Sequence, residues 1–385
     1  MNNRIQTIMA AITAVLLGLT AQAGPLDPPG PPSSTMRTLD EIYTEVQHTL
    51  DRVVDTLGVV VENEQHIQNL QQQVADLQQE LNTIKQRQGA AGFAETVGGM
   101  VLIPEGPFRM GDTFAESFGH ELPVHKVTVS AFYMDQYPVT KSLWDEVRGW
   151  VDDEGLGYTD LPEGAGEGPS HPAHSVNWYD AVKWCNARSE MEGLTPVYGR
   201  WVTYGDSKPV WLIYRTGEFD DIVFGDGNGY RLPTEAEWEK AARGGIEGRR
   251  FPWADGNTIS HHRANYEASP SSWDYDVNAM IGFHPDYSDG DPPHTSPVGS
   301  FPPNGYGLYD MAGNVWELCW DWYDTSYYEV SPDTNPRGPD LGTTRVRRGG
   351  AWSHNAFMSR SAYRIHGLPD RRVNYAGFRL VRSAP

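Results

Sequence analysis

The sequence predicts an α+β domain, poor in regular secondary structure, over residues 97–383, preceded by a coiled-coil helix over residues 39–88. Three observations support this fold class. The domain has short apolar segments between Gly and Pro clusters, it carries two well-signalled helix starts, and an uninterrupted apolar repeat precedes it. The chain contains 40 Gly, 28 Pro and 13 Trp, which is typical of a folded, turn-rich domain with aromatic anchors.

Strand and helix signals inside the domain are local. Residues 100–104 and 125–134 carry the β-branched, alternating pattern of strands. Asn177 is placed to cap a helix that runs past residue 185. Thr234, with a glutamate three positions later, forms a capping box that predicts a helix over residues 236–243.

The N-terminus has the pattern of a secretory signal peptide over residues 1–23. Arg4 precedes an apolar run over residues 8–19, and Ala-Gln-Ala follows as a cleavage site. The run is short for a membrane span, so we expect an exported protein, periplasmic or secreted, with no membrane span after cleavage. An uncleaved anchor is the alternative. Residues 24–38 are Pro-rich, which predicts an extended linker.

The segment over residues 39–84 carries apolar residues at alternating steps of three and four. Its second half contains the two heptad series of a coiled-coil seam, Ile67, Val74, Leu81 and Leu70, Leu77, Ile84. We therefore expect a homo-oligomer formed through this helix. A single amphipathic helix packed on the following domain remains the alternative.

The charge of the chain disfavours nucleic-acid binding, and its cysteine content disfavours a disulfide-stabilised fold. The formal net charge of -21 disfavours nucleic acid, whose binding depends on Lys and Arg neutralising phosphates. Cys185 and Cys319 are the only cysteines, and two cysteines define no disulfide framework. We expect both to be buried as small apolar residues.

Six ordered motifs give the chain a resemblance to the formylglycine-generating enzyme family, also called sulfatase-modifying factors. They are residues 98–112, 137–141, 174–182, 230–245, 251–253 and 302–317, followed by a closing Arg-Gly-Gly and Gly-Phe-Arg. The resemblance implies the mixed fold of this family, which is related in topology to C-type lectin domains.

The resemblance also indicates that the family chemistry is lost. Its members oxidise a substrate cysteine with two cysteines of their own, and these positions are His354 and Ser359 here. Ala351 replaces the serine of the family's Gly-Gly-Ser. Thiolates bind Cu(I), whereas imidazole and hydroxyl are much poorer ligands for it. We therefore expect no bound copper and no catalytic residues, which favours a protein that is not an enzyme.

Calcium is the cofactor that the resemblance implies, in a structural role. One set of ligands carries over to Asp310, the carbonyls of Gly313 and Val315, and Glu317. A second carries over to Asn265 and the carbonyl of Tyr266, with an acid near Asp289 or Asp291. These oxygen donors suit calcium. Alternatively, Asp310 and Glu317 are capping or salt-bridge residues.

The segment around the lost cysteines is predicted to form a ligand cleft of aromatic and amide side chains, namely Trp352, His354, Asn355, Phe357, Tyr363 and Tyr375. The favoured function is an exported, non-catalytic module that binds a peptide, protein or small molecule, on an oligomerising helix. One alternative is a periplasmic oxidoreductase of the formylglycine-generating or siderophore-maturation type with altered metal chemistry. Formylglycine generation itself is the third possibility.

Overall fold

The computed structural model describes residue 48 and residues 96–117, 119–205 and 207–384. The chain divides into two compact units, Met1–Ala91 and Gly92–Pro385. The predicted signal peptide, linker and coiled coil lie almost entirely outside the described residues. Within the described part, no helix is both long and apolar enough to cross a membrane.

The two ends of the domain meet in one antiparallel sheet. Its strands, in the order β1-β2-β5-β13, are β1 (Thr96–Val97), β2 (Met100–Ile103), β5 (Phe132–Asp135) and β13 (Val381–Ser383). The predicted strand over residues 100–104 is confirmed as β2. The strand predicted over residues 125–134 is instead two strands, because β4 (His125–Val129) pairs with β3 (Gly106–Met110) while β5 joins the terminal sheet.

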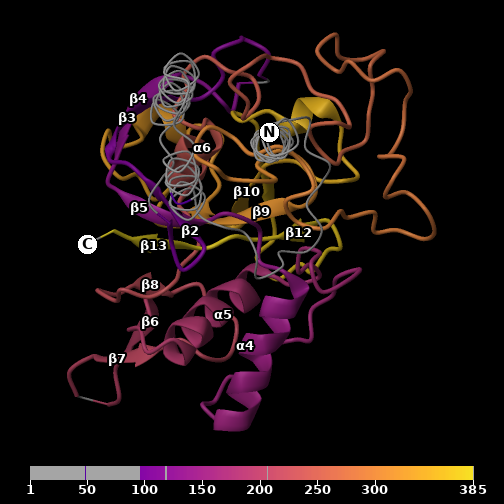
Figure 1. Ribbon diagram of the computed structural model, residues 1–385. Helices are drawn as coiled ribbons and strands as arrows, with labels where there is room; N and C mark the ends of the chain where they lie inside the picture. The colour runs from indigo at the N-terminus through magenta and orange to yellow at the C-terminus, as the bar shows by residue number, and fades with distance from the viewer. Residues whose placement is uncertain (1–47, 49–95, 118, 206, 385) are drawn as a thin grey trace, which may run out of the picture. The chain divides into compact units, whose positions relative to one another are not determined.

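A second sheet forms the centre of the domain (Figure 1). Its order is β11-β10-β9-β12, with β9 (Trp316–Trp322), β10 (Arg345–Arg348), β11 (Arg364–Gly367) and β12 (Ala376–Gly377). Side chains along a strand alternate between the two faces of a sheet, so Val346 and Arg348 face away from Arg347. The sheet positions the segment between β10 and β11, where the predicted site lies.

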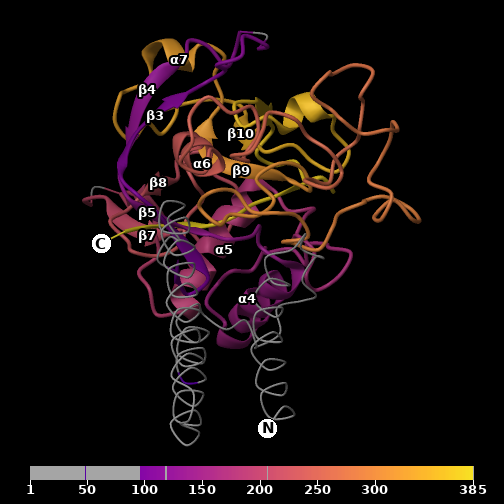
Figure 2. The same ribbon diagram turned by 45° about the horizontal axis from the view of Figure 1, so that its top comes forward.

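The helices begin where the capping residues predict. α5 (Trp178–Met191) has an Asn177 capping box, and α6 (Glu235–Ala242) has a Thr234 capping box. Both helix predictions are thereby confirmed. α4 (Lys141–Glu154) lies beside α5, with Trp144 and Trp184 stacked at 5.7 Å (Figures 1 and 2). The short α7 (Tyr327–Val330) and the 3-10 helix η1 (Ala356–Ser359) complete the set.

A third sheet follows α5 and was not predicted. Its order is β7-β6-β8, with β6 (Tyr198–Val202), β7 (Val210–Ile213) and β8 (Val223–Phe224). From residue 243 to residue 315, all of them described, the chain forms no helix or strand. The prediction of an α+β fold poor in regular structure is confirmed for this domain.

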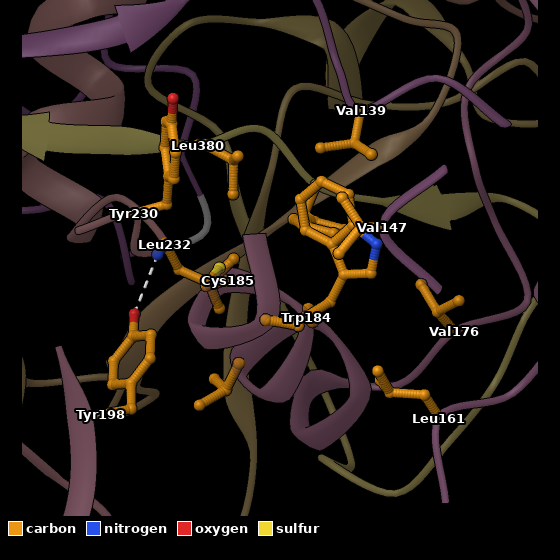
Figure 3. Close-up of a cluster of buried hydrophobic side chains, with 14 of the residues drawn as sticks. Val139, Val147, Leu161, Val176, Trp184, Cys185, Tyr198, Tyr230, Leu232 and Leu380 are labelled. Atoms are coloured by element: carbon orange, nitrogen blue, oxygen red, sulfur yellow. Dashed lines mark hydrogen bonds between the residues drawn. The ribbon is translucent and has the colours of Figure 1, made fainter. Parts of the chain in front are cut away.

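Both cysteines are buried in separate apolar clusters, as expected. Cys185 packs among core residues that include Trp184, Leu232 and Leu380, while Tyr198 accepts a hydrogen bond from the Leu232 amide at 2.8 Å (Figure 3). Cys319 belongs to a second cluster. Both thiols are free, and burial raises their pKa well above the ordinary value. They are therefore protonated at neutral pH.

Candidate functional site

A tight turn folds the chain back after β10. Gly349 and Gly350 have positive φ angles of 97° and 80°. A Cβ on Gly350 would lie 2.6 Å from the hydroxyl oxygen of Ser359, so glycine is required for the close approach of η1. The turn brings His354 and Ser359, the residues at the expected cysteine positions, into the same region.

Ser359 is inaccessible. Its side chain is fully buried, and its hydroxyl has no hydrogen-bond partner among the described residues. Ala351 is fully buried as well. These two positions therefore offer no nucleophile to a ligand from solvent.

His354 is partly exposed and is surrounded by aromatic rings. Its ring centroid lies 5.4 Å from Trp316 and 5.2 Å from Tyr375, and its Nδ1 lies 3.2 Å from the Ser353 hydroxyl. Desolvation, followed by the charge of Arg347, lowers the pKa of His354 to about 4. The imidazole is consequently neutral at physiological pH.

Four of the six predicted ligand-contact residues belong to one aromatic cluster, which consists of Trp316, His354, Phe357, Tyr363 and Tyr375. Phe357 and Tyr363 lie 5.1 Å apart, and Tyr363 lies 6.0 Å from Trp316. Trp316 joins the cluster from β9 and was missing from the prediction. Its only sequence signal was its position inside the proposed calcium motif.

The other two predicted residues lie beside this cluster. Trp352 contacts Phe283 at 5.7 Å and His294 at 5.1 Å, and its indole donates a hydrogen bond to the carbonyl of Asn374. Asn355 precedes η1, and its side-chain oxygen is buried without a partner among the described residues. Sequence reasoning also missed Arg347, a buried cation whose charge reaches His354 and Tyr375.

Asp310 has the properties of a cation ligand. One carboxylate oxygen accepts a hydrogen bond from the Gly299 amide at 2.7 Å, and the other is buried without a partner in the described structure. Burial raises the pKa of Asp310 to about 6, with a further contribution from the charge of Glu317. The two carboxylates are thus close enough to repel.

Glu317 is already engaged. Arg379 donates two hydrogen bonds to it, both at 2.6 Å, and the Trp238 indole donates a third at 2.7 Å. A carboxylate has about four acceptor positions, which leaves one for an ion. The salt-bridge interpretation of Glu317 is therefore correct, and calcium ligation by it remains a prediction.

The second set of proposed calcium ligands is less complete. The Asn265 amide nitrogen donates to the carbonyl of His294 at 2.7 Å, and its side-chain oxygen is buried with no partner among the described residues. The Tyr266 carbonyl lies 3.0 Å from the ring of His261. Asp289 and Asp291 are exposed and make no hydrogen bond to Asn265. Across the described residues, no group of three or more His, Cys, Asp or Glu side chains is placed to hold a metal.

Comparisons with known proteins show a matching family and similar sequences. Residues 87–384 match the family described as sulfatase-modifying factor enzyme 1-like domain. The chain is 33% identical over 311 residues to the formylglycine-generating enzyme of Streptomyces coelicolor, covering 77% of this chain and 93% of that protein. It is 32% identical over 299 residues to the chaperone protein LppX of Paenibacillus barcinonensis, covering 74% and 89%.

Solved structures share the fold. Treponema denticola variable protein 1 is similar with a TM-score of 0.55 and 29% identity, covering 75% of this chain and 98% of that one. Proteins described as an enzyme, a chaperone and a variable protein are thus all similar to this domain. The function must accordingly be argued from the site.

Proposed function

The chain belongs to the sulfatase-modifying factor family, and from this premise we propose that it is an exported, non-catalytic binding module. The observation that carries the proposal is the state of the two expected cysteine positions. His354 is a neutral imidazole within the aromatic cluster, and Ser359 is a buried hydroxyl. Neither supplies the thiolate that a Cu(I) site of this family needs.

The cysteines elsewhere in the chain do not compensate. Cys185 and Cys319 are fully buried in the two large apolar clusters, and neither packs in the cluster that contains Trp316 and Tyr363. Their raised pKa values keep both thiols protonated. A protonated, buried thiol neither attacks a substrate nor binds a soft metal.

The surface near the cluster suits recognition. His354 and Tyr375 are partly exposed, and aromatic rings provide rigid contact area at low entropic cost. A neighbouring loop exposes Met280 and Ile281, which are 75% and 68% accessible, and its Phe283 contacts Trp352. Exposed apolar residues gathered beside a site favour binding of another molecule.

The proposal extends to the rest of the chain. The signal pattern in residues 1–23 supports export. The apolar repeat in residues 39–84, with its heptads in residues 67–84, supports a coiled coil that presents several copies of the domain. We also infer a topology related to C-type lectin domains, which rests on the family resemblance. The chaperone and the variable protein among the similar proteins support a family role beyond catalysis.

Calcium would stabilise this module. The orphaned oxygens of Asp310 and Asn265 fit a hard cation, because a buried carboxylate or amide oxygen normally has a partner. Asp310 and Glu317, with the carbonyls of Gly313 and Val315, would hold one ion. Asn265 and the Tyr266 carbonyl would contribute to another. Bound calcium would neutralise the repulsion between Asp310 and Glu317.

The test is incubation of the purified protein with a cysteine-containing sulfatase-type peptide, with and without Cu(I), followed by mass spectrometry. We expect no conversion of the thiol to the aldehyde, whereas a formylglycine-generating enzyme converts the peptide as the positive control. His354→Cys alone should also be inactive, since catalytic residues that act as a unit are strongly non-additive. Copper-dependent aldehyde formation by the wild-type protein would contradict the proposal.

The second candidate is an oxidoreductase with altered metal chemistry. It is favoured by the similarity to a formylglycine-generating enzyme and by the neutral state of His354, since neutral imidazole is a metal ligand. Metal analysis of the purified protein distinguishes the two functions. A stoichiometric redox metal that is lost in His354→Phe would support the oxidoreductase, while calcium alone would support the binding module.

A further inference from the structure

Arg347 is a buried cation without a counterion. Its side chain is on the central strand β10, where it pairs in register with Ile365 of β11 and Leu318 of β9. It is only 6% exposed, and its Nε atom has no hydrogen-bond partner. Among the described residues, no carboxylate forms an ion pair with it and no aromatic ring stacks on it.

Other buried arginines in this region are compensated. Arg348 pairs with Glu239, Arg364 donates two hydrogen bonds of 2.7 Å to Glu235, and Arg360 lies 2.8 Å from Glu121. Arg345, on the same face of β10 as Arg347, has no carboxylate but lies 3.6 Å above the Trp178 ring and 3.3 Å from that of Trp322. It also donates a hydrogen bond to the Trp320 carbonyl. Arg347 is therefore the exception among the buried arginines of the described structure.

Arg347 lies beneath partly exposed residues, which include Ile365, Gly367 and Tyr375. Its guanidinium packs on Gly367, where a Cβ would lie 2.3 Å from Cζ. Trp316 lies two residues from Leu318 on β9, so it shares the sheet face of Arg347. The charge of Arg347 also reaches His354 and Tyr375, both of which are partly exposed. A buried charge that lacks a partner is strongly destabilising, and an unsatisfied buried polar group in a native structure calls for an explanation.

We propose that Arg347 anchors the carboxylate of a ligand whose apolar part packs against the aromatic cluster. This inference rests on the proposed binding function and names the ligand class for the same site. The guanidinium presents a planar fork of donors that matches a carboxylate with two parallel hydrogen bonds. The rings of His354 and Tyr375, together with partly exposed Ile365 and Val373, supply the apolar contact.

A carboxylate fits better than a phosphate group. Arg347 is a single positive charge, and a phosphate group carries nearly two negative charges at neutral pH. The whole chain has a net charge of -21, which disfavours a dianion further. The carboxylate can belong to a peptide C-terminus or to an acidic side chain, and different probes distinguish these sources.

The experiment measures binding of matched probes to the full mature protein by NMR or calorimetry. N-acetylphenylalanine carries a C-terminal carboxylate, and N-acetylphenylalaninamide is its neutral counterpart. The α-amide of N-acetylglutamate carries the carboxylate on a side chain, and the α-amide of N-acetylglutamine is its neutral counterpart. We expect one of the two acids to bind at least ~10-fold more tightly than its own neutral counterpart. Arg347→Met should remove this preference, and Arg109→Met, at an exposed arginine, should retain it.

A stability measurement keeps the test decisive if the probes bind weakly. Because Arg347 lacks a counterion, Arg347→Met should raise the melting temperature of the free protein while it removes acid binding. Unchanged acid preference in Arg347→Met, no acid preference in the wild type, or a lower melting temperature of Arg347→Met would each overturn the carboxylate anchor. The proposed binding function would be contradicted by a different result, which is oxidation of the cysteine peptide by the wild-type protein. The two experiments therefore distinguish a failure of the carboxylate anchor from a failure of the proposed function.

Discussion

At the residue scale, His354 shows how a site can keep its scaffold and change its chemistry. The imidazole takes the position expected of a thiolate, but it is enclosed by Trp316 and Tyr375 and lies near the positive charge of Arg347. Burial and this charge both oppose a second positive charge. The residue therefore behaves as a neutral aromatic contact and a potential hydrogen-bonding group.

His354 should make the stability of the domain depend on pH. Its pKa is lowered from 6.5 to about 4 in the folded state, so the folded protein binds fewer protons than the unfolded chain between these values. The contribution of His354 to the free energy of unfolding is fully present above the pKa of a histidine in the unfolded chain, and it is lost as the pH falls toward 4. His354→Asn should remove this contribution. The measurement is the free energy of urea unfolding of both proteins between pH 4 and pH 7.5.

The control for this prediction is His366→Asn, which removes a histidine from an exposed position on β11. As the pH falls, the free energy of unfolding of the wild type should decrease more than that of His354→Asn. A difference that does not change with pH would show that His354 titrates as it does in the unfolded chain.

Asp310 gives the second prediction at this scale. One buried oxygen of Asp310 has no partner among the described residues, and burial raises the pKa of the carboxyl group despite the nearby charge of Arg379, which indicates an incompletely compensated carboxylate. Calcium should raise the melting temperature, because an ion that binds only the folded state stabilises it by about 2.7 kcal/mol at a hundred times its Kd. Removal of calcium with a chelator should reverse this increase, as followed by thermal denaturation.

Asp310→Asn is the informative variant, since it keeps the shape and the acceptor for the Gly299 amide while removing the charge. Its response to calcium should be much smaller than that of the wild type. Glu317→Gln is a poor test, because it would also weaken the buried ion pair with Arg379. Equal melting temperatures of the wild type with calcium and with chelator would rule out the ion at Asp310.

At the element scale, the predictions that hold are those with local causes. The capping boxes at Asn177 and Thr234 satisfy the free amides of their own helix starts, so three or four residues suffice to locate α5 and α6. β12 is different, because it is a two-residue strand that pairs in parallel with β9 from sixty positions away in the sequence. Such a strand has too few residues to show a period, and its pairing depends on the tertiary fold.

Some residues of the candidate site could likewise be predicted from the sequence, and others could not. His354 and Ser359 follow from the register of the resemblance, because the Gly-Gly turn and the closing motif bound the segment. The role of Arg347 could not be predicted, because a sequence does not show whether a carboxylate lies near the side chain of an arginine in the folded protein. In this domain two glutamates of α6 form ion pairs with Arg348 and Arg364, which are distant in the sequence, and neither glutamate forms an ion pair with Arg347. Only the packed structure reveals that difference.

At the scale of the whole molecule, the last strand of the domain pairs with a strand near its beginning. β13, at the end of the chain, pairs with β5 near its beginning, and the Arg379 side chain joins Glu317 of β9 to the carbonyls of Asp135 and Gln136. The unit Gly92–Pro385 also contains the large apolar clusters. It therefore has the core that independent folding requires.

The last prediction concerns residues 39–84, which lie almost entirely outside the described residues. Their heptad positions would expose two apolar stripes along an isolated helix, so we expect them to associate and to make the mature protein an oligomer. Light scattering should show more than one chain for residues 24–385 and a folded monomer for residues 92–385. Leu70→Asp with Leu77→Asp should give the monomer without the deletion, whereas Gln72→Asp with Gln79→Asp, at heptad positions that face away from the seam, should not. A monomeric mature protein would show that the helix packs on its own domain, and the avidity expected of several linked domains would be absent.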